Sequence, residues 1–419
     1  MIKTILPGSS LPDGRQPTLG VLGGGQLGRM FVQAAQRMGY FTAVLDPDPA
    51  SPAGQVSQYH IGADYLDEQG LAQLMQRCAA ITTEFENVPA QVLVTLGSQR
   101  PVAPSAESVG IAQDRRQEKA MFTDCAAQSG VLPVPYAVIE TEADLAKLPD
   151  TLLPGILKTA RLGYDGKGQV KVANRAELAA AWTQLKNVPC VLEQQAALAA
   201  ECSVIVARGA DGSMVSLPVA RNVHIDGILA MSEVIEGNLP VALIELAQTA
   251  TKLIAQSLEY IGVLCVEFFI LKDASGGISD ASVLVVNEMA PRPHNSGHWS
   301  MDGCDVSQFE LQVRTLCGLH LPQPRQHSPS IMLNLLGDLW FKAGSSDKAQ
   351  VAKSPDWARV LALPGTHLHL YGKLDARRGR KMGHLNITGA SAQAVRATAQ
   401  EAAQILGISL VLSLSSSLN

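Results

Sequence analysis

The chain has 419 residues, of which 47% are hydrophobic and 17% are charged, and this composition excludes disorder as the default state. The 33 Lys and Arg stand against 38 Asp and Glu, and the net charge of −5 disfavours a protein built to coat DNA or an acidic membrane. No uncharged apolar run approaches the ~18 residues of a membrane helix, and the N-terminal apolar stretch is too short for a secretory signal. We therefore expect a cytoplasmic protein of two or three domains.

The cysteines agree with a reducing compartment. Their number is odd and none are in CxxC spacing, so they indicate buried thiols and neither a disulfide framework nor a zinc cluster. They are Cys78, Cys125, Cys190, Cys202, Cys265, Cys304 and Cys317.

Residues 1–17 are rich in Pro and Gly and predict an irregular leader. The first domain follows over residues 18–111. Here short apolar runs alternate with segments of helical spacing, which predicts a parallel sheet with helices on its faces. The expected strands are 18–23, 41–45 and 79–83, and the expected helices are 26–38 and 89–96.

Three further units follow. Residues 112–197 form a small unit with a polar helix at 113–129, a helix at 176–185 and four short strands at 136–139, 155–159, 169–172 and 190–194. Residues 198–320 are mostly strand, with helices at 241–259 and 307–317. Residues 321–419 hold strands near 331–335 and 367–371 and a helix at 391–406. The whole pattern predicts an α/β fold that is α+β in part.

The motif Gly23-Gly24-Gly25-Gln26-Leu27-Gly28 fits GxGxxG and lies between a strand and a helix. Its glycines allow a tight turn, and the helix N-terminus offers N–H groups to an anion. The motif alone leaves three interpretations open. They are a dinucleotide with Asp46 on the ribose, another phosphate-bearing ligand, and a purely structural turn.

A second glycine-rich loop, at 161–168, lies between two expected strands. It is not a Walker A motif, because the GK[ST] ending and the following helix are missing. Such a loop can close over phosphates, with Lys158 as a fixed cation at the end of the preceding strand. A plain hairpin loop is the alternative.

Two glutamates lie in apolar runs, Glu267 in VLCVEFFIL and Glu288 at the end of VLVVNE. If the segment between them turns as an antiparallel hairpin with its midpoint between Gly277 and Ile278, the two carboxylates face each other with Cβ atoms ~5 Å apart. Like charges in that position destabilise a sheet unless a cation lies between them. The pair therefore predicts a Mg²⁺ site shared with phosphates, with Asn287 as a further contact. The alternative is two edge carboxylates that only face solvent.

Two further segments are polar. The Pro- and Gly-shaped loop 291–299 carries Arg292 and two histidines, a composition suited to a phosphate or an oxyanion. The histidines are four residues apart, but Asn-Ser-Gly between them argues against a helical zinc site. A basic patch at 371–381 fits a single phosphate. The overall acidity and the lack of interleaved aromatics disfavour nucleic acid there, and a solvated loop stays open.

Together these segments resemble the ATP-grasp superfamily and, more closely, the N5-carboxyaminoimidazole ribonucleotide synthases of purine biosynthesis. The resemblance implies an N-terminal Rossmann-like domain, central ATP-grasp subdomains and a small C-terminal domain. The matching segments are GGGQLGRM (23–30), EFENVP (84–89), PSAES (104–108), LGYDGKGQ (162–169), NVHIDGIL (222–229), NEMAPRPHNSGHW (287–299), SQFELQVR (307–314) and GRKMGHLN (379–386).

The resemblance also implies roles for single residues. ATP, a co-substrate, is expected at Arg115, Lys158, Gly163, Tyr164, Asp165, Gly166, Lys167, Gly168, Glu193, Gln194, Ala196, Glu201, His224, Asn287 and Glu288. Mg²⁺, or Mn²⁺ in its place, is expected at Glu267 and Glu288. The aminoimidazole ribonucleotide and bicarbonate are expected at Gln26, Leu27, Glu84, Asn87, Tyr164, Asp165, Arg292, His294, Asn295, Lys373 and Arg380, with Arg377 and Arg378 as alternatives to Arg380. Catalytic roles are expected for Lys158, Tyr164, Asp165, Arg292 and His294.

The implied reaction is attack of bicarbonate on the γ-phosphate of ATP, followed by carboxylation of the exocyclic amine of the ribonucleotide. The implied partners are these small molecules and a second copy of the chain, with no nucleic acid and no membrane. Other readings stay open. They are another ATP-grasp ligase, such as a formate-dependent glycinamide ribonucleotide transformylase or a biotin carboxylase, an NAD-binding oxidoreductase, and a non-catalytic nucleotide-binding protein.

Overall fold

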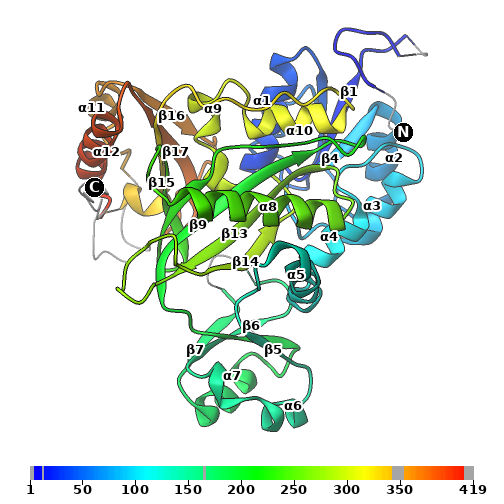
Figure 1. The fold of residues 1–419 in the computed structure, drawn as a ribbon. Helices are drawn as coiled ribbons and strands as arrows, with labels where there is room; N and C mark the ends of the chain where they lie inside the picture. Colours follow the sequence, from blue (N-terminus) through cyan, green and yellow to red (C-terminus); the bar gives the residue numbers. More distant parts are fainter. Residues whose placement is uncertain (1–3, 12–13, 164–166, 342–352, 410–419) are drawn as a thin grey trace.

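The structure is a computed structural model that describes residues 4–11, 14–163, 167–341 and 353–409. These residues form three sheets with helices packed against them (Figure 1).

The N-terminal sheet is parallel, as expected, with the strand order β3-β2-β1-β4. Its strands are β1 (Thr18–Leu22), β2 (Phe41–Leu45), β3 (Tyr59–Ile61) and β4 (Ala80–Thr83). The helices of this part are α1 (Gln26–Arg37), α2 (Glu68–Arg77), α3 (Ala90–Gly97) and α4 (Ala106–Ala112). The sequence reading missed α4. Its start is marked by Ser105, whose side chain accepts a hydrogen bond from the backbone N–H of Ser108.

The turn from β1 into α1 requires glycine at position 23. Gly23 has a φ of +96°, and a Cβ there would lie 2.5 Å from Cγ of Glu84. The chain therefore passes directly against Glu84, and this contact places that carboxylate at the start of α1.

Helix α5 (Arg115–Ser129) leads into the small sheet. Asp114 caps its N-terminus, and Gly130 in the left-handed conformation ends it. The small sheet is antiparallel with the order β5-β8-β6-β7. Its elements are β5 (Tyr136–Ile139), α6 (Glu142–Lys147), the short helix Asp150–Leu152, β6 (Gly155–Thr159), β7 (Gln169–Val172), α7 (Arg175–Gln184) and β8 (Cys190–Gln194).

The large sheet is antiparallel with the order β14-β13-β9-β11-β12-β15-β17-β16, and β10 pairs with β9. Its strands are β9 (Leu198–Arg208), β10 (Met214–Ser216), β11 (Ala220–Ile225), β12 (Ile228–Val234), β13 (Gly262–Leu271), β14 (Leu284–Ala290), β15 (Ser330–Leu336), β16 (Thr366–Leu370) and β17 (Lys381–Thr388). The helices that go with it are α8 (Val241–Ser257), α9 (Ser300–Gly303), α10 (Gln308–Leu316), α11 (Trp357–Leu361) and α12 (Ala392–Leu406). The short helices Asn295–Gly297 and Gly337–Trp340 lie between them.

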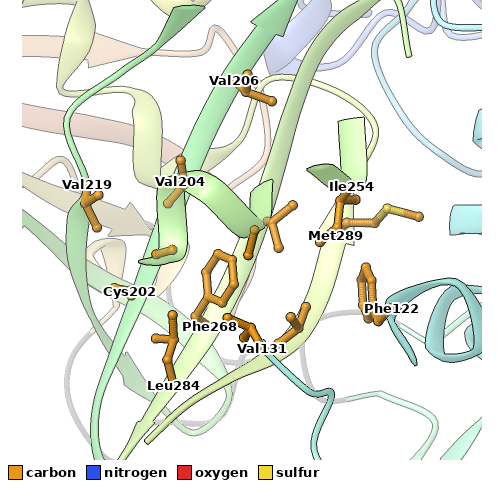
Figure 2. Packing of buried hydrophobic residues seen from close by; sticks show 14 of the residues in the cluster. Phe122, Val131, Cys202, Val204, Val206, Val219, Ile254, Phe268, Leu284 and Met289 are labelled. Carbon is orange, nitrogen blue, oxygen red and sulfur yellow. The ribbon is translucent and has the colours of Figure 1, made fainter. Parts of the chain in front are cut away.

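A buried apolar cluster joins α5 and α8 to strands β9, β13 and β14 (Figure 2). Phe122 of α5, Ile254 of α8 and Phe268 of β13 belong to it. Each of these three side chains is at most 1% exposed. The cluster makes the strands that carry Glu267 and Glu288 part of a rigid core.

The last strands continue the large sheet, because β15 pairs with both β12 and β17. No strand was expected at 381–388, since Lys381, His384 and Asn386 interrupt the apolar pattern. The structure makes this segment β17, and pairing with β15 on one side and β16 on the other buries His384 and Asn386 completely. Tertiary pairing overrides the local pattern here.

All seven cysteines are free and buried, which confirms the expectation of buried thiols. Within the described part of the chain, none of the helices combines the length and the apolar character that crossing a bilayer requires.

Candidate active site

The two glutamates predicted to oppose each other do so. Glu267 of β13 pairs directly with Glu288 of β14, and the next pair is Phe268 with Val286, so Asn287 is an extra residue in a β-bulge. The Oδ1 atom of Asn287 is buried and has no hydrogen-bond partner among the described residues. Three residues whose side chains carry oxygen ligands therefore lie at one irregularity of the sheet.

The two carboxylates have different neighbours. Oε1 of Glu267 lies 3.0 Å from Nε2 of His294, and Oε2 of Glu288 lies 3.0 Å from Nη1 of Arg115. Burial and the charge of Glu288 raise the pKa of Glu267. Burial would also raise the pKa of Glu288, but Arg115 and Lys158 outweigh it and lower that pKa.

These donors fit a hard cation. In the described ranges, no group of three or more His, Cys, Asp or Glu side chains is arranged to hold a metal, which is what a closed zinc site would need. Two carboxylates and an orphaned amide oxygen instead suit Mg²⁺, which takes few protein ligands and shares its remaining positions with water and phosphate.

A buried cluster of cations lies beside this pair. Nζ of Lys158 lies 2.6 Å from Oε2 of Glu193, and Nζ of Lys119 lies 3.0 Å from Oε1 of the same carboxylate. Burial would raise the pKa of Glu193, but the two lysines outweigh it and lower the pKa to about 2. Lys119 also donates to the carbonyl of Asn287 at 2.7 Å. One cluster thus ties β6, β8 and α5 to the bulge in β14.

Lys119 was not among the residues expected from the sequence. Its side chain is fully buried, and burial lowers its pKa. The signal was present, since Lys119 follows Arg115 by four residues and so lies on the same face of α5.

Replacing Lys119 by Met is expected to lower the free energy of unfolding by about 3 kcal/mol. The substitution removes one partner from a buried ion pair, and the retained Lys158 keeps the loss at the lower end of the usual range. Chemical denaturation measures the change. Lys147→Met is the control, because this lysine is 75% exposed and its loss is expected to cost less than about 0.5 kcal/mol. Equal effects of the two substitutions would contradict the assignment.

The other residues expected at ATP lie on neighbouring strands. Nδ1 of His224 on β11 lies 2.5 Å from Oε2 of Glu201 on β9. Burial would lower the pKa of His224, but its bond to Glu201 and the charge of Glu267 outweigh burial and raise it. The side chain of Gln194 is not part of this pair, since it donates to the carbonyl of Thr151. Ala196 is half-buried.

The glycine-rich loop between β6 and β7 begins close to α5. A Cβ on Gly163 would lie 3.8 Å from Nη2 of Arg115. The base of the loop is closed by a hydrogen bond from the N–H of Thr159 to the carbonyl of Gly168. Lys167 directly precedes Gly168 in the sequence. Tyr164, Asp165 and Gly166 lie outside the described residues.

The N-terminal glycine loop differs from the expectation. Glu84 accepts hydrogen bonds from the N–H groups of Gly25 and Gly28 at 2.6 and 2.9 Å, and Asp46 accepts one from Gly24 at 2.7 Å. The expectation that these N–H groups are open to the anion of a ligand is therefore wrong. Two carboxylates of the chain itself already neutralise the helix N-terminus.

Residues from the two ends of the chain meet beside this loop. Nζ of Lys373 donates to Oε1 of Gln26 at 2.8 Å and to the carbonyl of Lys381 at 2.7 Å. Leu27 packs its side chain in a cluster with Met30, Phe309 and Tyr371.

The remaining residues expected at the ribonucleotide are more exposed. Asn87 is exposed, and Arg380 is half-buried and donates to the carbonyl of Asp375 at 2.9 Å. Of the two alternatives to Arg380, Arg377 lies 3.7 Å from Asp375 and Arg378 lies 3.6 Å from Asp338.

The loop 291–299 carries the last group. Arg292 forms a two-pronged pair with Glu86, with Nε on Oε2 and Nη2 3.2 Å from Oε1. Glu86 was not among the expected residues, although it lies two positions after Glu84 in the matching segment 84–89. Burial and Arg292 hold the pKa of His294 well below its usual value. Asn295 is buried, and its Nδ2 has no hydrogen-bond partner among the described residues.

Comparisons with known proteins agree with this geometry. Three family models match the chain: the ribonucleotide synthetase preATP-grasp domain over residues 17–113, the ATP-grasp domain over 124–309, and the phosphoribosylaminoimidazole carboxylase C-terminal domain over 330–398. These matches confirm the expected fold class.

Individual relatives match over nearly the whole chain. The N5-carboxyaminoimidazole ribonucleotide synthase of Brucella melitensis biotype 1 is 41% identical over 88% of this chain and 95% of its own. The structure of N5-carboxyaminoimidazole synthetase from Staphylococcus aureus with ADP has a TM-score of 0.81 at 34% identity, covering 96% of this chain and 98% of that one. The structure of the synthase from Aspergillus clavatus with ADP and aminoimidazole ribonucleotide has a TM-score of 0.79 at 28% identity, covering 93% and 98%.

Identity of this extent, over a fold and a site assembled as described, places the chain in a family of ATP-dependent ligases, and it belongs to the N5-carboxyaminoimidazole ribonucleotide synthases.

Proposed function

We propose that this protein uses ATP and bicarbonate to carboxylate 5-aminoimidazole ribonucleotide, giving N5-carboxyaminoimidazole ribonucleotide, ADP and phosphate in purine biosynthesis. The relatives carry that product in their names, and the related structures hold ADP, or ADP with the ribonucleotide. The observation that carries the proposal is the meeting of Glu267 and Glu288 with the loop of Arg292 and His294. A phosphate-activating pair and an oxyanion-binding loop are then adjacent.

The nucleotide half would use the residues around Glu288. Mg²⁺ held by Glu267 and Glu288, with Mn²⁺ as a substitute, would neutralise charge on the ATP phosphates when bound. Lys158 and Arg115 lie beside Glu193 and Glu288 and would stabilise the charge on the γ-phosphoryl group as it moves. Glu201 and His224 would hold the nucleoside end. Tyr164 and Asp165 would contact ATP and the ribonucleotide and would take part in catalysis.

The carboxylation half would use the residues around Arg292. A bicarbonate oxygen attacks the γ-phosphorus, the bond to ADP breaks, and carboxyphosphate forms. The exocyclic amine then attacks the carboxyl carbon, and phosphate leaves. Arg292 and His294 would hold the bicarbonate, and Gln26, Glu84 and Lys373 would hold the ribonucleotide. Exclusion of water would protect the carboxyphosphate, which hydrolyses readily.

The test is ADP release with Mg-ATP and bicarbonate, with and without aminoimidazole ribonucleotide. We expect strong stimulation by the ribonucleotide and a carboxylated product that decays in acid. Stimulation by glycinamide ribonucleotide with formate in its place would assign a different acceptor within the same superfamily. ATP binding without ADP release under any condition would support a binding protein and contradict the proposal.

The family resemblance also carries our proposals that the protein is a cytoplasmic homodimer. Sedimentation equilibrium of the purified full chain tests the assembly. A monomer at micromolar concentration would contradict it.

A further inference from the structure

A chain of four buried polar side chains leads through the large sheet to His294. Ser232 donates to Oδ1 of Asn222 at 2.8 Å, and Nδ2 of Asn222 donates to Ser203 at 2.9 Å. Ser203 donates to Ser296 at 2.7 Å, and Oγ of Ser296 lies 2.9 Å from Nδ1 of His294. These are the members of the chain: Ser232 on β12, Asn222 on β11, Ser203 on β9 and Ser296 in the loop, each at most 4% exposed.

The hydrogen bonds that link these four side chains run in one direction from donor to acceptor. Each hydroxyl has one hydrogen, and that of Ser203 is used on Ser296. Ser296 therefore has its own hydrogen left for Nδ1 of His294. The backbone N–H of Ser296 also points at this nitrogen, at 3.4 Å, and a backbone N–H can only donate. The backbone contact requires Nδ1 to be an acceptor, and the hydroxyl contact agrees with it, although Oγ of Ser296 also lies 3.9 Å from Sγ of Cys265.

The other nitrogen of the ring meets the opposite requirement. Nε2 of His294 lies 3.0 Å from Oε1 of Glu267, an oxygen that can accept a hydrogen carried by Nε2. The two ends of the imidazole therefore agree on one form, with hydrogen on Nε2 and none on Nδ1.

The backbone of His294 is fixed independently. Oε1 of the buried Gln308 accepts from the N–H of His294 at 2.9 Å, and its Nε2 donates to the carbonyl of His294 at 2.8 Å. The same Nε2 contacts Nδ1 of His298 at 2.9 Å. Since the residue is clamped at both main-chain groups, a change at Nδ1 acts on the ring and leaves the position of the residue unchanged.

We propose that Asn222, Ser203 and Ser296 are positioning residues that hold His294 in the Nε2–H tautomer, so that the imidazole meets the reactants as a hydrogen-bond donor. This inference rests on the proposed role of His294 beside bicarbonate. An Nε2–H group can hold an oxygen of bicarbonate or of Glu267, both of which are acceptors. It cannot take a proton from either substrate at that atom.

The sharpest test is a substitution that reverses the chain without changing its shape. In Asn222→Asp the carboxylate accepts from both Ser232 and Ser203, so Ser203 no longer donates to Ser296. Ser296 then donates its one hydrogen to Ser203. It can therefore only accept from Nδ1 of His294, which requires a hydrogen on that nitrogen. We expect the Nε2–H tautomer to be lost, kcat to fall about ten- to hundredfold, and the KM for Mg-ATP to stay within about twofold.

The tautomer is read from the imidazole nitrogen shifts of ¹⁵N-histidine-labelled full-length protein, with His294 assigned by its absence in His294→Gln. An Nδ1–H form in the wild type, or an unchanged tautomer in Asn222→Asp, would overturn the proposal. Asn334→Asp is the matched control. It places the same buried charge in β15 of the same sheet, where Asn334 donates to the carbonyl of Leu229, and it should leave the His294 signals unchanged.

Should Asn222→Asp fail to fold, Ser296→Ala tests the same chain without adding a charge. We expect a loss of kcat of about tenfold with an unchanged KM for Mg-ATP, and full kcat would overturn the proposal. Ser330→Ala controls for the loss of a buried hydroxyl elsewhere in the sheet. The tautomer of His294 is measured without any turnover of substrate. Failure of ribonucleotide-stimulated ADP release would therefore remove the proposed function and leave the tautomer result as an independent outcome.

Discussion

Glu267→Gln is expected to lower kcat for ribonucleotide-stimulated ADP release by about 10²- to 10³-fold and, in the metal-free protein, to raise the stability. The activity falls because the substitution removes one of the two carboxylates that would hold Mg²⁺ at the phosphates. The stability rises by about 0.2–1 kcal/mol because Glu267 and Glu288 are directly opposed like charges. A Gln side chain can still place an acceptor oxygen near Nε2 of His294.

Thermal unfolding with and without Mg²⁺ separates the two effects. The wild type should gain stability on adding Mg²⁺, and the variant should not. Glu233→Gln is the matched control, since Glu233 is a buried strand glutamate of the same sheet that pairs with Arg396 at 2.7 Å. It should change neither kcat nor the response to Mg²⁺. A Glu267→Gln protein that is less stable without metal would count against repulsion between the two opposed carboxylates.

Arg292→Met is expected to lower kcat by about 10²-fold or more and to lower the free energy of unfolding by about 3 kcal/mol. The activity falls because the guanidinium is proposed to hold bicarbonate. The stability falls because Glu86 is left as a half-buried, unpaired charge. Arg292 holds the pKa of Glu86 below its usual value, despite burial that would raise it. Assays of ADP release and chemical denaturation measure the two losses.

A second substitution separates the loss of activity from the loss of stability. Glu86→Gln combined with Arg292→Met removes the orphaned charge, so it should recover much of the stability and none of the activity. Arg396→Met breaks the comparable pair with Glu233 and should cost stability alone. If Arg292→Met weakened only the binding of the ribonucleotide and left bicarbonate-dependent ATP cleavage intact, the proposed role of Arg292 in holding bicarbonate would be wrong.

The carboxylate pair shows how far counting along a sequence can reach. The register of an antiparallel hairpin follows from the position of its turn, and the midpoint near Gly277 was enough to place Glu267 opposite Glu288. The bulge at Asn287 did not follow from counting, since an extra residue leaves no mark in the apolar pattern. At this bulge, Oδ1 of Asn287 is buried and has no hydrogen-bond partner within the part of the chain that the structure describes.

Contacts between distant segments were beyond the sequence. Gln26 and Lys373 are 347 residues apart, Glu86 and Arg292 are 206 apart, and Lys119 and the carbonyl of Asn287 are 168 apart. Each pair requires two sheets, or a helix and a sheet, to be packed in one specific way. Gln26, Lys373 and Arg292 could be named from the family resemblance, but their contacts with one another or with Glu86 could not be read from the sequence.

By itself, the sequence determined the alternation of strands and helices and the opposed glutamates, because these depend on periodicity and spacing along the chain. The family was indicated separately, by segments that resemble those of known proteins. Only the tertiary structure decided what occupies the start of α1 and which nitrogen of His294 carries the hydrogen. The carboxylates of Asp46 and Glu84, from the segments after β2 and β4, lie at the start of α1. Serines and an asparagine from three strands and one loop act on the ring of His294. Hydrogen-bond direction is a property of groups brought together in space, and spacing along the chain carries no record of it.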